Sequence, residues 1–134
     1  AKLGQLHTQK AGTLEGDAQK EELKNADVAY EDLQNRYENA IEYATFMRAR
    51  VNSYQDPDQK LGLALPFYQK LEEMIAPKET KDKADNARLI EAYRYMISYY
   101  YVAKDDKAKA TEFAHKLLKI DPENDIAKQV LGVK

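Results

Sequence analysis

The chain has 134 residues, 43% of them hydrophobic and 33% charged, with five glycines, four prolines and no cysteine. This length and composition indicate one soluble, helix-rich domain with a core of its own. A formal net charge of −2 provides no strong basic field, which argues against nucleic acid or an anionic membrane as a partner. Without cysteine, the chain forms no disulfide, thiolate metal site or cysteine nucleophile.

Seven helices are predicted, because alanine, glutamate, lysine, leucine and glutamine dominate the chain and favour helices. Their ranges are roughly 1–11, 17–36, 38–54, 57–76, 83–103, 106–119 and 122–132. The sequences DPDQ and DPEN predict two of the helix starts, with Asp56 and Asp121 as N-caps and a proline in the first helical position. Pro66 falls inside the fourth range, where it indicates either a later start or a kink. No apolar run approaches the roughly 20 residues of a membrane span.

Five of the ten tyrosines lie in the stretch EAYRYMISYYYVAKDD, from residue 91 to 106. On a helical wheel, Tyr93 and Tyr100 share one broad apolar face with neighbouring aliphatic residues, and Tyr101 borders that face. Tyr95 and Tyr99 are four residues apart and point elsewhere. A helix with so narrow a polar strip is expected to pack against neighbours on more than one side.

The stretch from Glu91 to Pro122 resembles a tetratricopeptide repeat over the full length of that motif. The family pattern has a large apolar residue followed by a small one, then a tyrosine, an alanine in the second helix and a closing proline. These positions are filled here by Ile97, Ser98, Tyr101, Ala110 and Pro122. The small residues would let the two helices approach closely, and Tyr101 would fill the gap beside them.

Two weaker copies precede this repeat, with the small-residue pairs Gly4 and Ala26, and Ala49 and Ala64. The resemblance implies a single all-α domain, an α-α superhelix of about three helix-turn-helix repeats. The repeats would cover about residues 1–37, 38–77 and 86–121. A C-terminal capping helix, at about 122–132, would cover the apolar end of the stack.

The stretches RARVNSY and DPDQKLGLALPFYQ are also similar to a bacterial subgroup of the family, many of whose members are exported. This likeness implies the periplasm or cell envelope as one location, while the compartment itself stays open. The chain begins at Ala1 and Lys2 without a methionine, so we expect it to be a part of something longer.

A concave groove suited to binding a protein or peptide is what the resemblance implies. Aromatic residues and arginine are typical of binding hot spots. For Tyr95 and Tyr99, plain packing is an equal alternative, and for Arg50 the alternative is a salt bridge with a nearby acidic residue. The groove would be lined by Gln5, Thr8, Tyr43, Phe46, Arg50, Tyr54, Tyr95 and Tyr99.

Catalytic and metal-binding signals are lacking in the sequence. His7 and His115 each stand alone, with no second ligand at helical spacing, and no phosphate-binding or nucleophile motif occurs. We therefore predict no enzyme, cofactor or metal, and a non-enzymatic module for protein–protein interaction. The alternative is a structural spacer or self-association segment of a larger protein.

Overall fold

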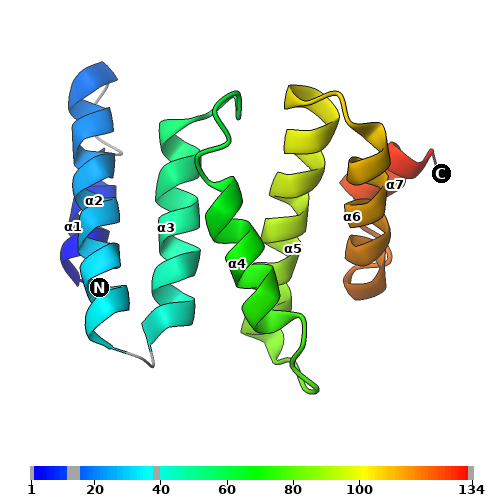
Figure 1. Cartoon of the computed structure of the whole chain (residues 1–134), viewed down its shortest axis with the longest axis horizontal. Coiled ribbons are helices and arrows are strands. Elements are labelled where there is room, and N and C mark those ends of the chain that lie inside the picture. Colours follow the sequence, from blue (N-terminus) through cyan, green and yellow to red (C-terminus); the bar gives the residue numbers. More distant parts are fainter. Residues whose placement is uncertain (1, 12–15, 38–39, 133–134) are drawn as a thin grey trace. The chain divides into compact units, whose positions relative to one another are not determined.

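The computed structural model describes residues 2–11, 16–37 and 40–132. The helices in this part of the chain are α1 (Lys2–Ala11), α2 (Gly16–Arg36), α3 (Ile41–Gln55), α4 (Leu65–Ile75), α5 (Lys83–Ser98), α6 (Lys107–Ile120) and α7 (Asp125–Leu131), as Figure 1 shows. A five-residue π-helical turn, η2 (Tyr99–Ala103), extends α5. No strand occurs among the described residues, so the expected all-α class is confirmed. None of the described helices is both long and apolar enough to cross a lipid bilayer.

The chain divides into two compact units within α4. The first unit comprises residues 1–57 and 61–67, in which α1 packs on α2 and α2 packs on α3. The second comprises residues 58–60 and 68–134, in which α5 packs on α6 and α6 on α7. The prediction that the chain is one domain of three repeats stays a prediction.

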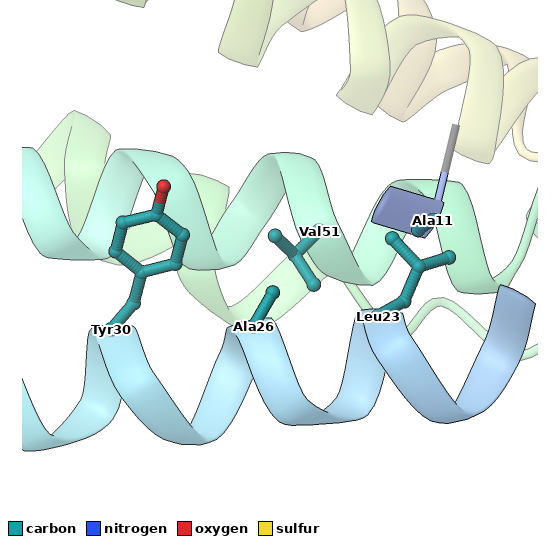
Figure 2. Close-up of a cluster of buried hydrophobic side chains, with 5 residues drawn as sticks. All are labelled: Ala11, Leu23, Ala26, Tyr30 and Val51. Atoms are coloured by element: carbon teal, nitrogen blue, oxygen red, sulfur yellow. The ribbon is translucent and has the colours of Figure 1, made fainter. Parts of the chain in front are cut away.

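The core of the first unit is a cluster of Ala11, Leu23, Ala26, Tyr30 and Val51, contributed by α1, α2 and α3 (Figure 2). Alanine at position 26 is fully buried, as the repeat pattern predicts. Gly4 is also buried, and a Cβ atom placed on it would lie only 2.7 Å from the Tyr30 ring. The close contact of α1 with α2 therefore depends on the missing side chain at position 4.

The start of α4 differs from the prediction, because the helix begins at Leu65 and not at residue 57. Asp56 caps no helix start. Its buried carboxylate instead accepts hydrogen bonds from the backbone N–H groups of Leu61 and Leu63, at 3.3 and 3.2 Å. These bonds hold residues 56–63 as a loop, and Pro66 falls in the first turn of a later helix, where proline is tolerated.

Side chains cap the starts of the three later helices, α5, α6 and α7. Asp82 forms a capping box with Asp85 at the start of α5, and Asp106 accepts a hydrogen bond from the backbone N–H of Lys109 at the start of α6. The predicted start of the last helix at Asp121 is wrong. Asn124 caps α7 instead, and its side chain accepts from the N–H of Ala127.

The end of α5 also departs from a regular helix. Its last turn widens into η2, where the N–H of Lys104 bonds to the carbonyl of Tyr99 and the N–H of Asp106 to that of Tyr100. Tyr101, expected in the core, is consequently 40% exposed. Tyr93 is buried as predicted.

Candidate functional site

Four of the eight predicted groove residues lie on α3, within the first unit. Tyr43, Phe46, Arg50 and Tyr54 recur at intervals of three and four residues, so they share one side of the helix. We call this set the α3 face. Tyr43, Phe46 and Arg50 are partly buried, and Tyr54 is 51% exposed. The guanidinium carbon of Arg50 lies 4.3 Å from the centre of the Phe46 ring, a cation–π arrangement that orients the side chain.

The N-terminal half of the α3 face is held by two contacts of Tyr43. Gln5 on α1 donates a hydrogen bond to the Tyr43 hydroxyl at 3.1 Å. The Tyr43 ring also meets Tyr30 on α2 edge to face, with centroids 6.2 Å apart. Burial raises the pKa of Tyr30 to about 12, so its ring stays neutral in the core at physiological pH. Gln5, a predicted groove residue, is therefore placed beside the α3 face.

A hollow of about 520 Å³ lies at the other end of the α3 face. Thr8 and Ala11 of α1 line it, together with Leu23 of α2 and with Ser53 and Tyr54 of α3. Its lining combines apolar surface with two hydroxyl groups near an exposed tyrosine, which is the composition of a small recognition pocket. Thr8 and Tyr54 were both expected from the sequence. Leu23 and Ser53 were not, because their part in the hollow depends on how three helices meet.

Arg48 forms an ion-pair network that sequence reasoning missed. Its Nε atom lies 2.9 Å from a carboxylate oxygen of Asp27, and its Nη2 atom lies 2.9 Å from that of Glu31. The guanidinium also donates to the Gln34 side-chain oxygen and lies 4.5 Å from the centre of the Phe67 ring. Asn52, one turn further along α3, donates to the same Asp27 carboxylate. The network fixes the rotation of α3 against α2 and so determines which residues the α3 face presents.

The remaining two predicted binding residues, Tyr95 and Tyr99, lie in the second unit. Their rings are parallel to within 8°, with centroids 6.3 Å apart, and each residue is only 7% exposed. Tyr95 also packs on Tyr68 of α4 with a centroid distance of 4.8 Å. The Tyr68 hydroxyl donates to the Glu91 carboxylate at 2.9 Å. These contacts favour the packing alternative for the pair, although their part in recognition stays a prediction.

His7 is occupied by a structural contact. Its Nδ1 atom lies 2.5 Å from the Glu22 carboxylate, which joins α1 to α2. The hydrogen bond with His7, and then Lys10, lowers the pKa of Glu22 below its usual value. His115 is exposed. Among the described residues, no three acidic or histidine side chains come together in a way that would hold a metal ion.

The structure is similar to the crystal structure of the C-terminal part of a TPR repeat-containing protein from Cytophaga hutchinsonii. The two chains share 32% sequence identity and superpose with a TM-score of 0.75. The match covers 96% of this chain and 46% of the other, so the present chain spans about half the length of that neighbour. No protein-family profile matches the sequence, and a search of curated proteins finds no match.

Proposed function

Because the chain is a tetratricopeptide-repeat protein in sequence and fold, we propose that it is a non-enzymatic module that binds a protein or peptide on the α3 face. The observation that carries this proposal is the row of Tyr43, Phe46, Arg50 and Tyr54 along one side of α3. The row ends at the hollow that Tyr54 helps to line. Large aromatic side chains provide much contact area at a low cost in conformational entropy, and arginine is enriched beside them at binding hot spots.

The expected partner is an extended segment that carries an apolar side chain and a carboxylate. The apolar side chain would enter the hollow beside Tyr54, and the carboxylate would approach Arg50, whose planar guanidinium suits a bidentate contact. Tyr43 offers a fixed hydroxyl for a further hydrogen bond, because Gln5 and Tyr30 hold its ring in place. A bacterial periplasmic or envelope location would fit this role, and it is part of the proposal.

A capture experiment with matched variants tests the proposal. Purified wild-type protein, an Arg50→Ala/Tyr54→Ala variant and a Tyr37→Ala control are used as bait in a native extract, and retained proteins are identified by mass spectrometry. Tyr37 is a suitable control because it is exposed to a similar extent as Tyr54, 55% against 51%. A partner retained by the wild type and the control, and lost by a double variant of unchanged helicity, supports the proposal. A partner retained equally by all three contradicts it.

Self-association is a second candidate function, favoured by an apolar surface in the second unit. Val102 is 71% exposed and Tyr101 is 40% exposed beside a hollow of about 370 Å³ that Ile97, Ile126 and Val130 also line. Exposed apolar patches of this kind are typical of association surfaces. Sedimentation velocity over a range of concentrations distinguishes the two, since self-association predicts a rise in mass that a Val102→Asp variant abolishes.

A further inference from the structure

A second hollow in the second unit lies between the end of α4, the loop before α5 and the end of α6, and has a volume of about 370 Å³. Its floor is apolar, formed by Ala76, Leu89, Tyr93 and Ile120. Leu89 and Tyr93 are 1% and 4% exposed, so the floor belongs to the rigid core of the unit and changes little in shape. We call this site the basic hollow because of the charges on its rim.

Three lysines and one glutamate stand around the floor. Glu72 is already occupied, because its carboxylate accepts a hydrogen bond from Lys116 at 3.3 Å. Among the residues that the structure describes, Lys81 donates only to the backbone carbonyl of Lys78, at 3.0 Å. Lys119 has no carboxylate partner within the described part of the chain. Two positive charges on the rim therefore remain without a neutralising carboxylate.

The nearby acidic groups are engaged elsewhere. The buried Asp85 carboxylate accepts hydrogen bonds from the Lys78 ammonium group, at 3.0 Å, and from the backbone N–H of Asp82. These hydrogen bonds lower the pKa of Asp85 below its usual value. Asp82 in turn caps the N–H of Asp85. The partial negative charge at the end of α6 offsets some of the Lys119 charge, but this effect is limited to the last turn and is screened by salt. The rim keeps a net positive field.

We propose that the basic hollow binds an acidic protein segment, with an apolar side chain on the floor and carboxylates on Lys81 and Lys119. The apolar floor distinguishes this ligand from a nucleic acid or a free polyphosphate, which have charge but no aliphatic group to place on Ala76 and Ile120, the accessible apolar residues of the floor. Complementary charge accounts for recognition, since a positive rim around an apolar surface favours a partner in which carboxylates flank an apolar side chain. This site shares no residue with the α3 face, so it stands or falls separately from the proposed function.

The probe for this proposal is a short fluorescein-labelled peptide in which leucine alternates with glutamate, titrated against the protein and followed by fluorescence anisotropy. We expect saturable binding that weakens as sodium chloride is raised, because exposed charge pairs are screened. Control peptides replace all glutamates by glutamine or all leucines by serine. Both are expected to lose binding, since each lacks one half of the recognition pattern.

Protein variants locate the site. In Lys81→Gln/Lys119→Gln the affinity is expected to fall by about tenfold, the combined effect of two charge contacts at a largely exposed rim. The matched control is Lys20→Gln/Lys24→Gln, which removes the same charge from exposed positions on α2 and should leave the affinity unchanged. The methyl resonances of Leu89 are expected to shift on peptide binding in the wild type.

Three results would overturn the proposal. One is the absence of saturable binding, and another is an equal loss of affinity in the two lysine variants. The third is full displacement of the peptide by tripolyphosphate at equal charge, without any shift at Leu89, which would mean that the lysines attract any polyanion.

Discussion

The guanidinium of Arg48 on α3 lies 2.9 Å from the Asp27 carboxylate on α2, and both side chains are largely withdrawn from solvent, at 14% and 21% exposed. This pair lies between α2 and α3, two of the three helices that form the core of the first unit. Because Glu31, Gln34 and Asn52 complete the hydrogen bonding around it, the pair specifies one rotation of α3. The composition of the α3 face follows from that rotation.

Replacing Arg48 by alanine is expected to lower the free energy of unfolding by about 2–3 kcal/mol, because Asp27 would be left without its charge partner in a partly buried site. Urea unfolding followed by circular dichroism measures the change. Arg36→Ala is the control, since Arg36 forms an exposed pair with Asp32 on the same helix. Its effect should stay below about 0.5 kcal/mol. Equal effects of the two substitutions would show that the Arg48 network contributes nothing specific.

A Gly4→Ala variant is expected to be less stable than the wild type despite the higher helix propensity of alanine. The new methyl group would lie 2.7 Å from the Tyr30 ring, which is itself packed in the core. Overpacking of this kind costs about 1–3 kcal/mol, more than the roughly 1 kcal/mol that alanine contributes in a helix interior. Thermal unfolding would show the loss.

A double-mutant cycle identifies the cause of that loss. The smaller ring-free side chain in Tyr30→Leu should remove most of the penalty of Gly4→Ala, so the two substitutions are expected to be non-additive. Gln9→Ala, at an exposed position of α1, serves as the control for helix propensity alone. A Gly4→Ala protein more stable than the wild type would contradict the close contact of α1 with Tyr30.

Stability in acid is expected to depend on Asp85. Hydrogen bonding by Lys78 and by the N–H of Asp82 lowers the pKa of Asp85 in the folded state, so the folded protein binds this proton less readily than the unfolded chain. The contribution of Asp85 to the free energy of unfolding is therefore complete well above about pH 4, where an aspartate in the unfolded chain titrates. It is lost as the pH falls through the lower pKa of the folded state.

Urea midpoints measured between neutral and acid pH test this linkage. Asp85→Asn should flatten the decline in stability below about pH 4, since the titrating group is gone. Lys78→Gln should flatten it as well, because Lys78 is the largest cause of the lowered pKa. A decline as steep in both variants as in the wild type would assign the acid sensitivity to other carboxylates.

Tyr95 and Tyr99 provide a prediction that separates packing from recognition. Because each is 7% exposed and stacked on its neighbour, Tyr95→Ala and Tyr99→Ala are each expected to destabilise the protein by about 3 kcal/mol. Tyr54→Ala, at a residue 51% exposed, should cost less than about 1 kcal/mol. Stable alanine variants of Tyr95 and Tyr99 that lose a binding partner would instead assign the pair to recognition.

Much of the fold was predictable because local chemistry agrees with global packing. The buried small residues at positions 26, 49 and 110 follow the repeat spacing, which can be recognised within a single helix pair. The late start of α4 was not predictable, since an aspartate followed by a proline can either cap a helix or close a loop. Asp56 does the latter through the N–H groups of Leu61 and Leu63, and only Pro66 signalled it.

The candidate site was predictable only in part, for a related reason. Spacing along α3 placed Tyr43, Phe46, Arg50 and Tyr54 on one side of the helix, because helical periodicity needs no tertiary information. The partner of Arg48 could not be identified in this way, since Asp27 lies 21 residues away on another helix. The π-helical turn at Tyr99 likewise has no distinctive composition, and it moves Tyr101 out of the core.

Site-specific photocrosslinking tests whether a protein segment binds beside Tyr54. A benzophenone amino acid is introduced at position 54 or, as the control, at the similarly exposed position 37, and each protein is irradiated in native extract. We expect a discrete crosslinked protein at position 54 that is absent at position 37 and is abolished by Arg50→Ala. Crosslinks of equal yield to the same proteins at both positions, or none at position 54, would contradict this expectation.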